Sequence, residues 1–298
     1  MKNVIVTGAN GFIGSSLIKK LIEKEVNVIA LDISFQNSKL PKSGIITEIE
    51  TSLDDVNALF RLIPDAEYDA MYHLAWAGVN GPSKSDPVIQ LKNAEMAMNC
   101  ASVSKRLGVK KLLCAGTIAE RAIESLPNLK TTSGGMMYGV AKYCTHLMLE
   151  TYCKNIGLDF VWMQFSNIYG PSNKTGNLVS YTINELEKGN KASFGPALQP
   201  YDFIYVEDLI EAVLRLGEYE TKSNCYFIGS GEPRQLKEYL LKIGQLYGRE
   251  DLIKIGLRPD DGIKYTWEMF DTVLLKQDIG EYITKNFNEG IKYTLDNY

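Results

Sequence analysis

Residues 4–32 read VIVTGANGFIGSSLIKKLIEKEVNVIALD, and this stretch decides the fold. An apolar run leads into a turn that carries Gly8, Gly11 and Gly14. A helical pattern of apolar residues follows, and a second apolar run ends in Asp32. This order predicts a strand, a tight turn, a helix and a second strand, which is the unit that binds a dinucleotide.

Each part of this unit has a physical reason. Glycine takes backbone angles that are closed to other residues, and a turn without Cβ atoms lets the chain approach a pyrophosphate. The N-terminus of the following helix points free N–H groups and its positive dipole end at the phosphates. Asp32 can accept hydrogen bonds from a ribose 2′-hydroxyl. An ordinary strand–helix turn would also carry glycines, but the two strands, the helix and Asp32 together favour dinucleotide binding.

The composition narrows the classes of function. A chain of 298 residues forms one large domain or two of ordinary size. A net charge of -4 and a pI near 5.5 argue against binding to a nucleic-acid polymer. No apolar run approaches the roughly 18 residues that a membrane span needs, and no signal-peptide pattern precedes the first strand. We therefore expect a cytoplasmic protein that does not enter a membrane.

Cysteines and histidines give no sign of a disulfide framework or a metal centre. The five cysteines form no CxxC pair and their number is odd, so reduced, mostly buried thiols are the simplest account. His73 and His146 are the only histidines, which argues against a histidine-based metal site. We expect no metal.

Strands and helices alternate through about residue 165, which predicts an α/β fold with a Rossmann-type, doubly wound parallel sheet. We assign residues 1–165 to the dinucleotide-binding domain. Beyond them the segments shorten and turns become frequent, so we assign residues 166–298 to a smaller α+β substrate-binding region. Within that region, residues 201–216 read as a strand followed by a helix, and we expect them to return to the main sheet.

Tyr138 and Lys142 are spaced i, i+4 on a predicted helix and share one face of it. A neighbouring ammonium stabilises phenolate and lowers the pKa of a tyrosine from about 10 toward neutrality, which makes it a usable general acid or base. Thr117 ends the preceding strand and offers a hydroxyl to the reacting oxygen. Without the other motifs, the simplest interpretation would be a half-buried tyrosine beside a surface lysine, and a threonine that caps a helix. Their position after a dinucleotide fingerprint favours chemistry.

Taken together, these motifs resemble the extended short-chain dehydrogenase/reductase family, in particular its NAD-dependent epimerase/dehydratase branch, which acts on nucleotide-activated sugars. The resemblance covers nearly the whole chain. Its motifs, in order, are Gly8-x-x-Gly11-x-x-Gly14, His73-Leu74-Ala75, Asn93 with Asn99, Thr117, Tyr138 with Lys142, NIYGP at 167–171, DFIYVED at 202–208 and RPDD at 258–261.

The resemblance implies a cofactor, a substrate and a set of site residues. The cofactor is NAD, and NADP is less favoured because the Asp32 carboxylate would repel a 2′-phosphate. The catalytic residues are Thr117, Tyr138 and Lys142, and the contacts to a nucleotide sugar come from Thr117, Asn167 and Arg258. The implied cofactor contacts are Gly8, Gly11, Phe12, Ile13, Gly14, Asp32, Leu53, Leu74, Ala75, Asn93, Tyr138 and Lys142. The family commonly dimerises through the helices that begin near Val88 and Tyr138, so we expect a homodimer.

Several positions depart from the family pattern. Tyr201 stands where the family has an arginine before Asp-Phe, and Gln164 replaces an arginine that precedes Asn-Val-Tyr-Gly-Pro. Ser52 replaces an acidic residue near the adenine. The Tyr-Gly that usually follows the catalytic hydroxyl is missing, since residues 118–121 read IAER. These departures leave the substrate contacts open.

The residues after Thr117 separate the reactions of the branch. The 4,6-dehydratases carry Asp-Glu where this chain has Ile118 and Ala119, and the 3,5-epimerase-reductases carry a cysteine at the place of Ala119. A C4 epimerase and a 4-ketoreductase of deoxysugar biosynthesis remain. Because Asp32 favours NAD, which an epimerase retains and recycles, we favour the epimerase, although the chain length and C-terminal half also resemble ketoreductases. A non-catalytic, dinucleotide-sensing protein is the third alternative, and it would not need Thr117, Tyr138 and Lys142 together.

Overall fold

The computed structural model describes residues 1–124, 136–173, 176–260 and 265–298. Within these residues, seven parallel strands form the main sheet in the order β11-β6-β5-β4-β1-β2-β3. The order reverses between β1 and β4, so a crevice for ligands is expected at the carboxyl ends of these two strands. The strands are β1 (Asn3–Thr7), β2 (Asn27–Asp32), β3 (Ile46–Glu50), β4 (Ala70–His73), β5 (Lys111–Thr117), β6 (Asp159–Phe165) and β11 (Cys225–Ile228).

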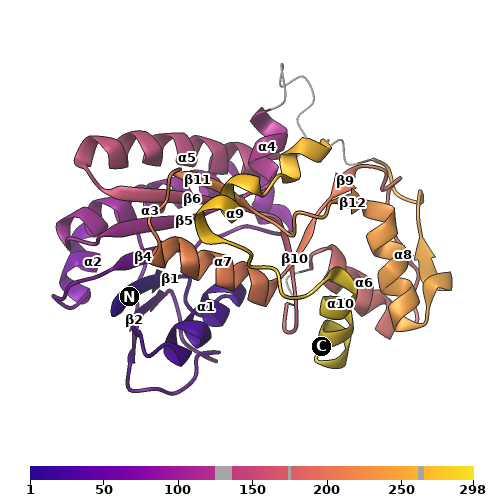
Figure 1. Ribbon diagram of the computed structural model, residues 1–298, viewed down its shortest axis with the longest axis horizontal. Helices are drawn as coiled ribbons and strands as arrows, with labels where there is room; N and C mark the ends of the chain where they lie inside the picture. The colour runs from indigo at the N-terminus through magenta and orange to yellow at the C-terminus, as the bar shows by residue number, and fades with distance from the viewer. Residues whose placement is uncertain (125–135, 174–175, 261–264) are drawn as a thin grey trace.

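Helices cover both faces of this sheet (Figure 1). One face carries α1 (Phe12–Glu23) and α7 (Val206–Glu218), which pack against each other. The other face carries α2 (Val56–Leu62), α3 (Pro87–Arg106) and α5 (Met136–Ile156). Because successive side chains of a strand point to opposite faces, Val4 and Val6 enter the core under α1 while Ile5 enters the core under α3. The predicted doubly wound parallel sheet is confirmed.

A second region lies beyond the carboxyl ends of the strands, at the right of Figure 1. It contains α6 (Leu178–Glu187), α8 (Leu236–Tyr247) and α10 (Phe287–Asp296), and its core includes a cluster of aromatic rings from Tyr169, Phe203, Tyr239 and Phe287. Its short strands are β7 (Asn167–Tyr169), β8 (Ala192–Ser193), β9 (Pro200–Tyr201), β10 (Phe203–Tyr205), β12 (Arg234–Gln235) and β13 (Ile253–Lys254). The remaining elements are α4 (Ala119–Glu124), α9 (Val273–Ile279), η1 (Pro82–Ser85), η2 (Glu250–Leu252) and η3 (Trp267–Phe270).

The segment expected to return to the main sheet does so only in part. Helix α7 does return, and it packs on α1. The strand before it does not, because β10 pairs with β7 in a separate two-stranded sheet, with Phe203 opposite Asn167. The strand that extends the main sheet beyond β6 is β11, which follows α7 in the chain. The prediction that residues 201–206 join the main sheet is therefore wrong.

Among the described residues, no helix combines the length and the apolar character that crossing a bilayer requires.

Candidate functional site

The glycine turn forms a cradle that side chains would fill. Gly8 has a φ of +67°, and a Cβ at this position would lie 2.8 Å from the backbone nitrogen of Ala75. A Cβ on Gly14 would lie 2.1 Å from the carbonyl oxygen of Gly8. Gly11 is the N-cap of α1, so no side chain covers the first N–H groups of that helix. Phe12 and Ile13 follow it, half-buried, in the first turn. This backbone surface fits the pyrophosphate of a dinucleotide.

Asp32 ends β2 and closes the turn. Its carboxylate accepts hydrogen bonds from the backbone N–H of Asn10 at 2.9 Å and of Ile33 at 2.8 Å. The side chain is half-buried. Asp32 therefore fixes the glycine turn and keeps a negative charge beside it, where a ribose would lie.

The other residues assigned to the cofactor surround the same edge of the sheet. Leu53 is buried, and its carbonyl oxygen accepts a hydrogen bond from Asn99 at 3.0 Å. Leu74 and Ala75 follow β4, and Ala75 packs against Gly8. Asn93 of α3 is buried, and its amide donates to the carbonyl of Ala77 and accepts from the N–H of Ala77, both at 2.8 Å. Asn93 thus holds the loop that follows β4.

Thr117, Tyr138 and Lys142 meet at the end of β5. Thr117 is the last residue of that strand, and Tyr138 and Lys142 lie in the first turns of α5. The hydroxyls of Thr117 and Tyr138 share a hydrogen bond. Trp76, next to Ala75 in the loop after β4, makes an edge contact with the Tyr138 ring at 6.3 Å and lies 3.6 Å from the Lys142 ammonium. One loop therefore connects the glycine turn with the three predicted catalytic residues.

The pKa of Tyr138 beside Lys142 differs from the value expected from the sequence. Burial raises the pKa of Tyr138 above its ordinary value, so the lowering expected from the nearby ammonium is not observed. The negative charge of Glu120 raises the pKa of Tyr138 further, and the Lys142 ammonium donates to the carbonyl oxygen of Ala115 at 2.5 Å. Lys142 is itself buried, and burial lowers its pKa.

The motifs do not reveal Glu120 and Trp162 as polar neighbours of this centre, and they mark Gln164 only as a departure from the family pattern. Glu120, the third residue after Thr117, is completely buried, and its carboxylate accepts from the Thr117 N–H at 2.6 Å. The same carboxylate accepts from Trp162 at 2.8 Å and Gln164 at 3.2 Å, both on β6. An acid among the mostly apolar residues directly after Thr117 was the available signal. Its side-chain partners, Trp162 and Gln164, lie more than forty positions away in the sequence.

The residues assigned to the substrate lie in the second region. The Asn167 amide donates to the carbonyl of Asp202 at 3.1 Å and accepts from the Tyr201 hydroxyl at 2.8 Å, so the tyrosine that replaces an arginine holds Asn167. Arg258 is exposed and donates to the Tyr181 hydroxyl at 2.7 Å. Tyr181, Tyr201 and Arg258 line one cavity of about 340 Å³. Asn167 contacts its rim through Tyr201.

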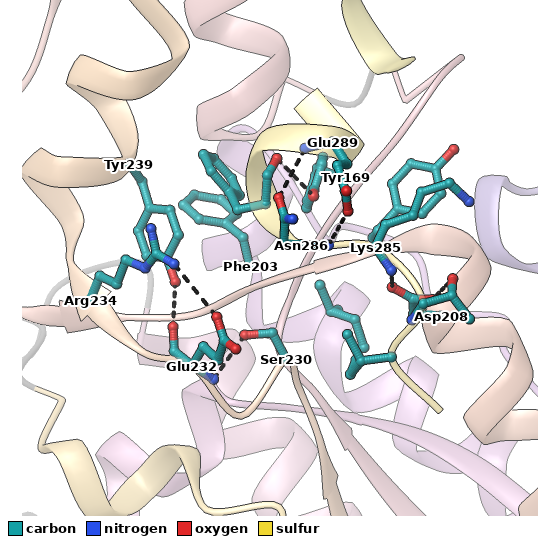
Figure 2. A pocket seen from close by; sticks show the side chains of 15 residues that line it. Tyr169, Phe203, Asp208, Ser230, Glu232, Arg234, Tyr239, Lys285, Asn286 and Glu289 are labelled. Carbon is teal, nitrogen blue, oxygen red and sulfur yellow. Dashed lines mark hydrogen bonds and ion pairs between the residues drawn. The ribbon is translucent and has the colours of Figure 1, made fainter. Parts of the chain in front are cut away.

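A separate cavity of about 270 Å³ lies among β10, α8 and α10 (Figure 2). Its polar groups are largely satisfied by one another. Arg234 lies 3.5 Å from Glu232, and the Tyr239 hydroxyl donates to the Glu232 carbonyl at 2.8 Å. Asp208, from the 202–208 motif, accepts from the backbone of Thr284 at 2.9 Å. The residues that line this cavity include none of those assigned to catalysis.

A glycine turn, an aspartate after the second strand and a Thr–Tyr–Lys group at the same edge of a doubly wound sheet define the extended short-chain dehydrogenase/reductase class. Within that class, the chain belongs to the NAD-dependent epimerase/dehydratase family, whose sequence model matches residues 4–229.

Relatives with different reactions resemble this chain to a similar extent. The dTDP-4-dehydro-6-deoxyglucose reductase of Escherichia coli is 24% identical over 253 residues, which cover 80% of this chain and 79% of the relative. The UDP-glucose 4-epimerase of Thermotoga maritima, solved with UDP-glucose, has a TM-score of 0.82 and 24% identity, with 99% and 97% of the two chains covered. The enzyme WbmF of Bordetella bronchiseptica, solved with NAD+, has a TM-score of 0.79 and 25% identity, with 99% and 92% covered.

Proposed function

We propose that this enzyme is an NAD-dependent C4 epimerase of a nucleotide-activated hexose. The observation that carries the proposal is the placement of Thr117, Tyr138 and Lys142 beside a glycine turn that Asp32 closes. The Asp32 carboxylate would attract a ribose hydroxyl and repel a 2′-phosphate, which supports NAD over NADP. When bound, NAD supplies a hydride acceptor and donor that is regenerated in each epimerisation cycle.

The side chains divide the proton chemistry between them. Tyr138 exchanges a proton with the sugar hydroxyl, and Thr117 hydrogen-bonds the same oxygen and the Tyr138 hydroxyl. Lys142 supplies positive charge that stabilises phenolate. Because burial and, to a smaller extent, the charge of Glu120 raise the pKa of Tyr138, the proposal requires the cation of Lys142 and the positively charged cofactor to lower it in the complex.

The sugar nucleotide would extend from this centre into the cavity lined by Tyr201 and Arg258. The exposed guanidinium of Arg258 can pair with a diphosphate oxygen, and Tyr181 orients it. This assignment makes residues 166–298 mainly the substrate-binding region and residues 1–165, with α7 and β11, the cofactor-binding region.

A 4-ketoreductase is the second candidate, and the relative from Escherichia coli favours it. Both reactions would use the same three residues, but a reductase consumes one reduced cofactor for each turnover.

We further propose a cytoplasmic homodimer. Val88 and Leu91 of α3 are 73% and 71% exposed, and Leu147 and Met148 of α5 are each 46% exposed. Apolar side chains on two packed helices support an interface with a second copy of the chain. The five free cysteines support a reducing compartment.

One experiment separates the two reactions. The purified protein is examined for retained nicotinamide and then supplied with UDP-glucose, or with dTDP-4-dehydro-6-deoxyglucose and NADH or NADPH. We expect interconversion of UDP-hexoses that differ at C4, or of another nucleotide hexose in a wider panel, without net change in reduced cofactor. Stoichiometric oxidation of NADH or NADPH by the 4-keto sugar would instead establish the reductase.

A further inference from the structure

Glu120 is a carboxylate with no exposure to solvent, three residues from the hydroxyl of the predicted catalytic centre. Among the described residues, it accepts three hydrogen bonds, from the Thr117 backbone, the Trp162 indole and the Gln164 amide, all of which are uncharged donors. Withdrawing a carboxylate from water is unfavourable unless hydrogen bonds and a counter-charge compensate for the lost hydration. A buried carboxylate at this position therefore suggests a role beyond packing.

The backbone around Glu120 leaves room for this carboxylate. A Cβ on Gly116 would lie 2.8 Å from the Glu120 carboxylate and 2.4 Å from the Trp162 indole nitrogen. Gly139, the residue after Tyr138, approaches the Ala119 carbonyl, with 3.1 Å between that oxygen and a Cβ at position 139. Gly116 on β5 leaves space for the Glu120 carboxylate and the Trp162 ring, and Gly139 lets α5 approach α4. The site is therefore built by four elements: β5, β6, α4 and α5.

Several charged or titratable groups face Glu120. On α5, Lys142 lies 5.7 Å from the centre of the Trp162 ring, whose nitrogen donates to Glu120. His146 stacks on the same ring, and its Nδ1 lies 3.8 Å from the carboxylate. Further groups that sense its charge are Tyr138 on α5, Arg121 on α4 and Cys225 on β11. Arg121 is engaged elsewhere, because it donates to Gln164 at 2.8 Å and to the Met269 carbonyl at 2.7 Å.

We propose that Glu120 is a positioning residue of the catalytic centre, which holds Thr117 against Tyr138 and supplies the negative charge that faces the Lys142 ammonium. This role rests on the proposed function for its effect on turnover, but not for its effect on Lys142. The hydrogen bond to Thr117 and the charge near Lys142 have different effects. The hydrogen bond fixes the end of β5. Burial raises the pKa of Glu120 to about 7, so its charge is present above about that pH, where it offsets the burial that lowers the pKa of Lys142.

A purely structural role requires only acceptors for the three donors, and the single oxygen of glutamine can accept from the Thr117 N–H, although its NH2 group cannot accept from Trp162 or Gln164. A role through Lys142 requires the charge itself. Three variants separate these roles. Glu120→Gln removes the charge, Glu120→Asp keeps it, and Glu124→Gln removes an exposed carboxylate from the same helix as the matched control.

The decisive measurement is the titration of Lys142 in protein saturated with NAD. Lysine is labelled with carbon-13 at Cε, and the Lys142 resonance is assigned by its loss in Lys142→Arg. In Glu120→Gln we expect the pKa of Lys142 to fall by about one unit, because an attractive charge has gone. Glu120→Asp and Glu124→Gln should stay close to the wild type. An unchanged titration in Glu120→Gln would overturn the role of the charge.

Turnover gives the second readout. Glu120→Gln should lower kcat by about tenfold or more with little change in KM, since misplacement of catalytic groups affects the transition state most. The fall in log kcat at high pH should begin about one unit lower, because Lys142 loses its proton earlier. A uniform loss at every pH, without that displacement, would assign Glu120 to structure alone. If the wild type turns over no nucleotide sugar, the proposed function fails while the Lys142 titration still decides the inference.

Discussion

Gly14 and Gly8 are in such close contact that a methyl group on Gly14 would lie 2.1 Å from the carbonyl oxygen of Gly8. It would also lie 2.9 Å from the α-carbon of Ala9. Both neighbours are backbone atoms, which no rotamer change can move away. The turn and the helix that follows it are therefore fitted to each other through the missing side chain.

Gly14→Ala should consequently destabilise the fold and abolish NAD binding. Overpacking of a closed site costs about 1–3 kcal/mol, and displacing the Gly8 carbonyl opens the turn that receives the pyrophosphate. Urea unfolding and NAD titration measure the two effects. Gly44→Ala is the control, because a Cβ at that position meets nothing within 4 Å. Equal stability and equal NAD affinity in both variants would contradict the fitted turn.

Asp32→Ser should shift cofactor preference from NAD toward NADP. The substitution removes the charge that would repel a 2′-phosphate, and a serine hydroxyl can donate to it. It also removes the acceptor for the Asn10 and Ile33 N–H groups, so affinity for NAD should fall as well. Dissociation constants for both cofactors provide the test. If the ratio of the two stays within about twofold of the wild type, the charge of Asp32 does not select the cofactor.

Tyr138→Phe should lower kcat by about 10²- to 10⁴-fold, the range that general acid–base catalysis contributes. The ring remains for the edge contact with Trp76, so cofactor binding and folding should be nearly unchanged. Turnover of the nucleotide sugar found in the panel is measured beside NAD affinity and the melting temperature. Tyr143→Phe is the control on the same helix. A variant that keeps full turnover would remove Tyr138 from the mechanism.

His73 should make folding stability depend on pH. Burial lowers the pKa of His73 from 6.5 to about 3, so the folded chain keeps it neutral where the unfolded chain binds a proton. The stabilisation is thus complete above pH 6.5 and is lost as the pH falls from 6.5 toward 3. Between about pH 7.5 and about pH 5.5, His73 should account for about 1.4 kcal/mol.

Urea unfolding of the wild type and of His73→Gln at those two pH values isolates this contribution. Glutamine keeps polar atoms near Thr7, whose hydroxyl lies 2.9 Å from His73 Nδ1, but it does not titrate. The variant should therefore lose less stability on acidification than the wild type. Parallel losses in the two proteins would show that His73 is not the responsible group.

The parts predictable from sequence are those that local pattern determines. Residues 4–32 carry a strand, turn, helix and strand whose periodicities are read directly, and all four elements form where expected. The N-cap of α2 at Asp55, which accepts from Asn57 and Ala58, follows from the same local chemistry. The i, i+4 spacing likewise puts Tyr138 and Lys142 on one helix face.

The features that could not be predicted from the sequence depend on contacts between distant residues. Spacing gives the helix face of Lys142 but not the direction of its ammonium, which Ala115 on β5 determines. Glu120 has partners on β6 that no local pattern connects with it. Strand β11 consists of four residues, and only its pairing with β6 shows that it belongs to the main sheet.

The position of β11 late in the chain affects how the protein folds during its synthesis. The cofactor-binding sheet is not contained in the first 165 residues, because α7 covers α1 and β11 protects the outer edge of β6. A chain emerging from the ribosome must therefore extend past Ile228 before its first domain can close. Until then β6 presents an open edge and α1 an uncovered apolar side, and both kinds of surface favour aggregation.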